Sequence, residues 1–224
     1  MLSQKTKKGN SMHGFSESNH SLILQTATQE FLSHGFAGAS MRTIAKNAHL
    51  TTGALYRHFA NKAELFDAIV NPVRDEVVQR FQCQTETYID LLPTVGMQVM
   101  WERGAQGWGM QEFALYIYEH LDLFKLLFLA SADMAQSFFH TLIDLESSCT
   151  NRYLLAAKEQ GLPVRIPTEQ EMHLLCNAQF SLLFELVFHE IPKEEGLGYV
   201  QTMDRFFIAG WKAIIMHSPS GELE

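Results

Sequence analysis

Apolar residues along this chain recur at steps of three and four, the spacing that places them on one face of an α-helix. Ile23, Ala27 and Phe31 follow one another at four-residue steps, and Gly35 comes soon after them, where glycine commonly ends a helix. Strict alternation of apolar and polar residues, which would indicate strands, is absent from the sequence. The pattern therefore predicts an all-α protein whose first helix covers about 19–34.

Two short helices and a longer one follow the first. Ser40 is suited to cap a helix over 41–48, and after a break at 49–51 the next helix covers 52–59. Asn61 then caps a longer helix that begins at the next residue. Two short helices joined by so tight a turn, packed on a first helix, predict a tri-helical helix-turn-helix unit.

The remainder of the chain continues as helices separated by proline and glycine. Pro72 is expected to kink the helix that begins after Asn61, because a proline removes an internal hydrogen bond. A further helix is expected near 84–104, with a break around Pro93 and Gly96. The other expected helices cover 107–118, 120–132, 134–160, 168–189 and 197–216.

These elements divide the chain into three expected parts. Residues 1–18 are rich in Lys, Ser, Gly and Asn and are interpreted as a disordered basic arm. A helix-turn-helix domain is expected at 19–62 and a larger helical domain at 63–224. The charge, motifs and apolar faces described below are the reasons to expect DNA binding by the first and ligand binding and dimerisation by the second.

The composition is that of a folded protein of a reducing compartment. The 224 residues are 46% hydrophobic and 11% aromatic, enough for a hydrophobic core, which excludes general disorder. The three cysteines, Cys83, Cys149 and Cys176, form neither a disulfide framework nor a metal-binding spacing. No apolar run follows the first lysines, and the longest apolar stretches, 121–132 and 180–188, are too short and too charged to span a bilayer. We therefore expect a cytoplasmic protein without a membrane segment.

Charge is distributed unevenly along the chain. The net charge is −8, but the first 62 residues carry seven basic and two acidic residues, a net +5, and the rest of the chain carries −13. A basic segment joined to an acidic body attracts phosphates locally while the body stays away from DNA. This asymmetry favours a nucleic acid partner for the N-terminal segment, although a solvated charged tail would produce part of it.

Four motifs within residues 22–70 give a family resemblance. The first helix ends in FLSHGF, the second contains TIAKNA, and LYRHF and NKAEL follow. With these motifs the segment resembles the TetR/AcrR family of bacterial regulators. The resemblance implies a DNA-binding transcription regulator, and a repressor is the expected type because such proteins usually block a promoter. The chain departs from the family pattern at His49, where glycine is usual, but histidine tolerates a left-handed backbone better than most residues. Whether the lysine arm contacts DNA stays open.

The resemblance assigns the helix over 52–59 to the DNA major groove, where base edges differ in their hydrogen-bonding pattern. Thr51, Thr52 and Gly53 begin this helix nearest to the bases, and Arg42 is long enough to reach a guanine edge. The side chains expected to hold phosphates are Thr43, Tyr56, His58 and Lys62, the last beside the positive end of its own helix. The structural alternatives are a core position for Tyr56 and an exposed, inert one for His58.

The expected helices over 168–189 and 197–216 are apolar nearly all round, so each needs packing partners on more than one side. Such a pair at the end of a small chain predicts a four-helix interface with a second copy. The expected interface residues are Phe180, Phe184, Phe207 and Trp211. Burial inside one subunit is the alternative. A homodimer would place two recognition helices one turn of DNA apart, which implies a palindromic double-stranded operator.

Aromatic residues and methionines gather between residues 84 and 132, and such side chains form adaptable pockets for apolar ligands. The candidate effector-binding residues are Trp101, Trp108, Tyr116, Phe124 and Phe128. An ordinary core is the alternative. We expect a small, largely apolar effector that releases the protein from DNA, and no cofactor.

Two other classes of function compete with a regulator. For an enzyme, the sequence has no phosphate loop, nucleophile elbow, HExxH motif or glycine-rich dinucleotide turn. The spacings nearest to a metal site are single pairs, namely His173 with Cys176, Glu185 with His189 and His140 with Asp144. A metal-dependent helical bundle needs several such pairs to converge, so we expect no metal and no catalytic residue. The second alternative is an interaction module without DNA binding, against which Arg42, Tyr56 and Lys62 argue.

Overall fold

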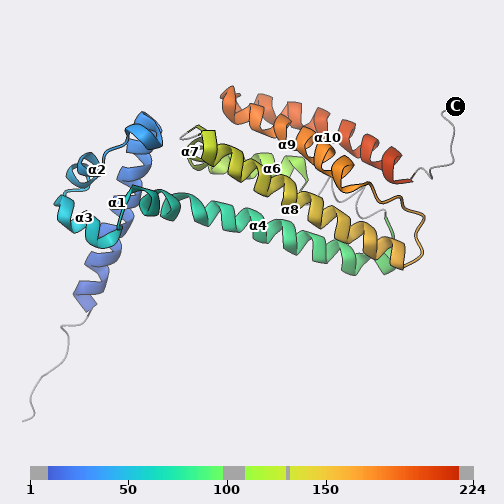
Figure 1. The fold of residues 1–224 in the computed structure, drawn as a ribbon, viewed down its shortest axis with the longest axis horizontal. Helices are drawn as coiled ribbons and strands as arrows, with labels where there is room; N and C mark the ends of the chain where they lie inside the picture. The colour runs from blue at the N-terminus through green and yellow to red at the C-terminus, as the bar shows by residue number, and fades with distance from the viewer. Residues whose placement is uncertain (1–9, 98–108, 130–131, 217–224) are drawn as a thin grey trace, which may run out of the picture.

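The computed structural model describes residues 10–97, 109–129 and 132–216, and within these ranges the chain forms nine α-helices and no strand. The first three helices form a small unit at one end of an elongated molecule (Figure 1): α1 (Asn10–Gly38), α2 (Met41–Asn47) and α3 (Thr52–His58). The others form the larger body: α4 (Lys62–Val95), α6 (Met110–Glu119), α7 (Leu121–Leu129), α8 (Ala132–Glu159), α9 (Glu169–Phe188) and α10 (Lys193–Met216). The all-α prediction is confirmed.

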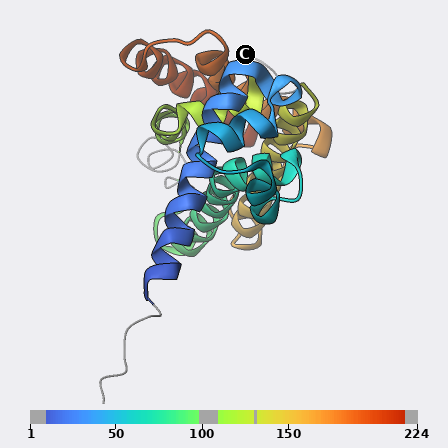
Figure 2. The ribbon, with the colours of Figure 1, turned by 90° about the vertical axis from the view of Figure 1, so that its left-hand side faces the viewer.

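Helix α1 ends as predicted but begins earlier. Gly35 has φ 68° and ψ 171°, a conformation outside the helical range, so the regular helix stops at His34. At the other end the helix starts at Asn10, and the expectation of a disordered arm is therefore wrong for residues 10–18. Extending a helix that is already packed requires no new nucleation, which lets these mostly polar residues continue it. This extension projects away from α2 and α3 (Figure 2).

Helix α4 belongs to both parts of the molecule. Near its start Phe66 meets Phe31 of α1 edge-on, with ring centroids 5.2 Å apart. Farther along, Phe81 meets Phe113 of α6 at 5.8 Å and Phe180 of α9 at 6.1 Å. The N-terminal unit and the body are therefore joined through one helix that packs aromatic side chains against both, and their buried residues form one hydrophobic cluster.

The predicted break near residue 84 is wrong, because α4 is one helix of 34 residues that passes through Pro72 and Pro93. Val73, Val77 and Phe81 continue its buried face at four-residue steps, so packing on the body is unbroken. The helix ends where Gly96 takes φ 58° and donates its N–H to the Leu92 carbonyl.

The body is built around α8, which packs against α4, α7 and α9, while α10 packs against α6 and α9. In Figure 1, α9 and α10 lie along the edge of the body opposite α4. Helix α7 contacts α1 as well as α4, α8 and α9, so the body touches the N-terminal unit at a second place besides α4. The predicted bounds of the helices after α6 hold to within a few residues.

Candidate DNA-binding surface and internal cavity

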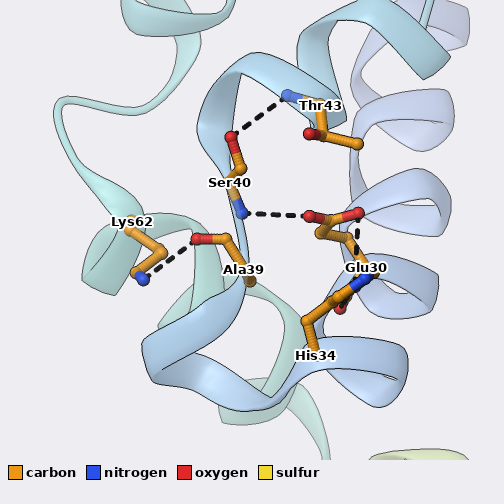
Figure 3. Close-up of polar contacts among 6 residues, drawn as sticks. All are labelled: Glu30, His34, Ala39, Ser40, Thr43 and Lys62. Atoms are coloured by element: carbon orange, nitrogen blue, oxygen red, sulfur yellow. Dashed lines mark hydrogen bonds and ion pairs between the residues drawn. The ribbon is translucent and has the colours of Figure 1, made fainter.

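A buried carboxylate fixes the corner between α1 and α2 (Figure 3). Glu30 is 7% exposed, and its Oε1 accepts a hydrogen bond of 3.0 Å from the backbone N–H of Ser40. The Ser40 hydroxyl in turn accepts from the backbone N–H of Thr43 at 3.4 Å, which caps α2 as predicted. His34 Nδ1 lies 3.7 Å from the other carboxylate oxygen of Glu30. The start of α2 is therefore held at a fixed position on α1.

The turn between α2 and α3 has the predicted geometry. His49 takes φ 57°, the left-handed conformation expected for this position, and the N–H of Leu50 reaches the Ala45 carbonyl at 2.8 Å. The Thr51 hydroxyl accepts from the N–H of Ala54 at 3.1 Å and caps α3. Fully buried Leu55 attaches the inner side of α3 to the N-terminal unit. The opposite side of α3 faces outward.

Most of the side chains predicted to contact DNA are exposed or partly exposed. Tyr56 is 49% exposed, so the alternative of a core position for it is wrong. Arg42, Thr51, Gly53 and His58 are also exposed, and Thr43 and Thr52 are partly exposed. Within the described part of the chain, the exposed basic residues Arg42, Lys46 and Arg57 make no ion pair with an acidic side chain. Helices α2 and α3 and the turn before α3 thus expose both basic side chains and hydroxyl groups.

Lys62 has a role that sequence reasoning missed. Its ammonium donates to the backbone carbonyl of Ala39 at 3.1 Å (Figure 3). It also donates to the Ala37 carbonyl at 2.9 Å and lies 5.0 Å from the centroid of the Phe36 ring. These contacts attach the start of α4 to the α1–α2 corner. The Lys62 ammonium therefore points toward the α1–α2 corner of the N-terminal unit, where two of its three N–H groups are used. That its third N–H contacts a phosphate stays a prediction.

The substitution Lys62→Met is expected to lower the free energy of unfolding by roughly 1–2 kcal/mol, because it removes two hydrogen bonds from a charged donor. Urea unfolding of the purified protein measures the change. Lys46→Met is the matched control, since Lys46 is exposed on α2 and no hydrogen bond or ion pair of its side chain is present among the described residues. Equal stability of the two variants would show that the Lys62 contacts do not support the fold.

A cavity of about 140 Å³ lies between the helices of the body and is partly open to the surface. It is lined by side chains from α4, α6, α8, α9 and α10, so every long helix of the body contributes to it. Most of the lining is aromatic or aliphatic, namely Phe81, Tyr88, Met110, Phe113, Tyr153, Phe180, Leu183, Phe207, Ile208 and Trp211. The polar members are Gln84, Thr85, Glu146, Cys149, Thr150, Gln179 and Asp204. A mostly apolar cavity with a few polar groups is typical of a small-molecule site.

The residues predicted to bind an effector are not those that line this cavity. Tyr116, Phe124 and Phe128 are at most 5% exposed and pack in the core beside it. The Tyr116 hydroxyl donates to Glu76 of α4 at 2.9 Å, so its polar end is already occupied. The other two predicted residues, Trp101 and Trp108, lie outside the described residues. Phe113, one turn of α6 away from Tyr116, does line the cavity.

Burial shifts the protonation of the acidic groups in and near the cavity. It raises the pKa of Glu146 to about 7, and the Thr150 hydroxyl, 3.3 Å from Glu146 Oε1, offsets only part of this effect. Burial also raises the pKa of Asp204 and that of the Tyr153 hydroxyl. The pKa of the Cys176 thiol, which is fully buried nearby, is raised to about 12 by the same cause, so this thiol stays protonated.

The four residues predicted for a dimer interface are buried inside one subunit. Phe180 and Phe184 are 2% exposed, Phe207 is 8% and Trp211 is 9%, so none is available to a second copy. The Trp211 indole N–H donates to Gln179 at 3.1 Å within the same chain. Because these helices are apolar nearly all round, the sequence pattern did not show which side faces the core. The exposed apolar residues of the two helices are others: Leu174, Leu182, Phe188, Tyr199, Phe206 and Met216.

The described residues contain no group of three or more His, Cys, Asp and Glu side chains that could hold a metal ion. Of the pairs noted in the sequence, Glu185 and His189 form an exposed ion pair of 2.7 Å. No single helix in the described ranges is long and apolar enough to cross a membrane. Leu121–Phe128 and Asp133–Glu159, which are bent by 110° relative to each other, are together long and apolar enough by length and composition alone.

Comparison with known proteins agrees with this geometry. Residues 23–69 match the family model of the bacterial regulatory proteins of the tetR family. The uncharacterized HTH-type transcriptional regulator YhgD of Bacillus subtilis is 39% identical over 59 residues, which is 26% of this chain and 31% of YhgD. The probable acrEF/envCD operon repressor of Escherichia coli is 36% identical over 59 residues, 25% of this chain and 27% of the repressor. The chain thus matches less than a third of the length of these relatives.

Similarity to solved structures extends over most of the chain. SmeT, the repressor of the Stenotrophomonas maltophilia multidrug efflux pump SmeDEF, aligns with a TM-score of 0.59 at 22% identity, covering 92% of this chain and 96% of SmeT. NalD, the secondary repressor of the MexAB-OprM multidrug efflux pump in Pseudomonas aeruginosa, aligns with a TM-score of 0.57 at 17% identity, covering 87% and 97%. At this level of identity the alignments establish a shared fold.

Proposed function

This chain belongs to the TetR/AcrR family, and on that basis we propose that it is a transcription repressor that binds a palindromic DNA operator as a dimer and leaves it when a small molecule binds. The observation that carries the proposal is the outward face of α3, which has an exposed Tyr56 and a capped N-terminus, while Arg42 at the start of α2 is exposed and forms no ion pair within the described residues. A capped helix N-terminus next to free cations is suited to phosphates and base edges.

In the proposed complex, α3 enters the major groove and Arg42 reads a base edge from the start of α2. Thr43, Tyr56 and His58 hold phosphates on either side of the groove. The contacts of Glu30 and Lys62 act at a distance from the DNA, because they fix the angle between α1, α2 and α4 on which the position of α3 depends.

The proposed dimer uses the outer faces of α9 and α10. On α10, Tyr199 and Phe206 lie two turns apart on one side of the helix, 50% and 68% exposed. Leu174 and Leu182 are similarly exposed on α9, at 62% and 36%. Exposed apolar side chains gathered on adjacent helices indicate a surface that is covered by a partner, and two-fold symmetry lets a second copy cover it with the same residues.

The proposed effector site is the internal cavity, and α4 links it to the DNA. Phe81, Gln84, Thr85 and Tyr88 of α4 line the cavity, while the same helix begins in the N-terminal unit. A ligand that binds more tightly to a conformation in which α4 is displaced than to the DNA-binding conformation would favour the displaced one. The spacing of the two recognition helices would then change. A tenfold decrease in DNA affinity requires that the ligand's binding free energy differ by about 1.4 kcal/mol between the two conformations. By linkage, bound operator lowers the affinity for the ligand by the same factor of ten.

DNA binding is tested with fragments from both sides of the protein's own gene in a gel-shift assay. Arg42→Ala is expected to lower affinity by roughly 1–3 kcal/mol for the preferred base and to relax specificity at that position. Tyr56→Ala should weaken binding to all fragments uniformly, and affinity should fall steeply with salt because counterions are released. Lys212→Ala, which removes an exposed charge on α10, is the control. Absence of binding by the unaltered protein would instead favour an interaction module.

A further inference from the structure

We propose that the internal cavity selects a cationic apolar molecule, in which a protonated amine is attached to an aromatic or alkyl body. This inference rests on the proposed function, because it names the ligand class of the proposed effector site. Its basis is the placement of two carboxyl groups, Glu146 on α8 and Asp204 on α10, in a lining that contains no basic side chain among the described residues.

The two carboxyl groups have no positive partner within the described ranges. Neither Glu146 nor Asp204 forms an ion pair there, and Asp204 is only 6% exposed. The Thr150 hydroxyl donates to one oxygen of Glu146 and leaves the other oxygen open. A buried carboxyl without a cation is costly to the fold, and a positive ligand would neutralise it in place.

The aromatic walls favour the same ligand class. Tyr88 and Tyr153 meet edge-on at 6.2 Å, and Phe113, Phe180 and Trp211 complete the lining. The faces of such rings attract an ammonium group, while their area covers an apolar body. An anionic molecule such as a fatty acid would instead meet two carboxyl groups and no cation.

An unsatisfied polar group is an independent indication of a ligand. The Tyr153 hydroxyl is buried, belongs to a residue that lines the cavity, and has no hydrogen-bond partner among the described groups. Buried polar atoms without a partner are rare in folded proteins, and a bound molecule is a common explanation. A protonated amine can donate to this hydroxyl and to a carboxylate at the same time.

The test compares three probes of similar shape: 4-phenylbutylamine, 4-phenylbutan-1-ol and 4-phenylbutanoate. Their binding to the full chain is measured by titration calorimetry without DNA at about pH 8, where a primary amine is still protonated. The amine is expected to bind at least about tenfold more tightly than the alcohol, and the carboxylate most weakly. Glu146→Gln and Asp204→Asn should each reduce the ratio of the amine's affinity to the alcohol's affinity. Glu159→Gln, at the exposed end of α8, is the matched control.

Three results would overturn the proposal: equal affinity for the amine and the alcohol, tighter binding of the carboxylate, or no binding of the amine at millimolar concentration. Retention of the full amine preference in both carboxyl variants would also contradict it, because the preference would then arise elsewhere. None of these results bears on operator binding, which the gel-shift assay measures without a ligand. Failure of the ligand class and failure of the regulator function can therefore be told apart.

Discussion

Phe206→Glu is expected to convert the proposed dimer into monomers and to weaken operator binding by roughly two to four orders of magnitude, because each half-site loses its tethered partner. Phe206 is 68% exposed on α10, the largest exposed fraction among the large apolar residues described. A charge at this position costs the single subunit little, since the side chain already faces water there. In a dry interface with a second copy, the same charge would be buried without a partner.

Light scattering measures the assembly state, and the gel-shift assay measures operator affinity. Gln201→Glu is the matched control, because Gln201 is also exposed on α10. Its side chain points about 140° away from that of Phe206 around the helix axis, on a different side of the helix. Urea unfolding should show both variants folded. A Phe206→Glu variant that remains dimeric would place the interface on another surface.

Glu146→Gln is expected to stabilise the folded protein at high pH. Burial raises the pKa of Glu146 from 4.5 to about 7, which corresponds to about 3 kcal/mol. Between these two values the unfolded chain has released the proton while the folded chain still holds it, so the stability of the unaltered protein falls as pH rises. Glutamine mimics the neutral acid and does not titrate. The variant should therefore be more stable by about 3 kcal/mol at pH 8 and by less than about 1 kcal/mol at pH 5.

The measurement is urea unfolding of the two proteins across this pH range, with Glu159→Gln as the control for loss of one carboxylate from α8. The difference between Glu146→Gln and the unaltered protein isolates the cavity carboxyl from all other titrating groups. A difference that stays constant from pH 5 to about 8 would mean that Glu146 is ionised throughout and in contact with water or a cation.

The N-terminal unit was predicted closely because local chemistry determines its boundaries. Ser40 and Asn61 cap helices with their own side chains, and Gly35 ends a helix through its own backbone conformation. Each of these signals acts within a few residues, so it can be read without knowledge of the rest of the fold. The left-handed turn at His49 was predictable for the same reason.

The body was predicted less completely because its contacts join distant segments. Phe206 and Phe207 are adjacent in the sequence, yet one is exposed and the other lines the cavity. When a helix is apolar on several sides, its periodicity does not identify the side that faces the core. The contact of Lys62 with the Ala37 and Ala39 carbonyls likewise spans more than 20 residues of sequence and leaves no local pattern.

The continuity of α4 has a consequence for how the protein unfolds. Phe66 of this helix packs on the N-terminal unit and Phe81 packs in the body, the helix between them is unbroken, and the buried residues of both parts form one hydrophobic cluster. Opening of either part removes packing from a helix that the other part also needs, so the two parts are coupled in folding as well as in space. Heating should therefore give one cooperative transition, and amide hydrogens in the middle of α4 should exchange with solvent only when the whole chain opens.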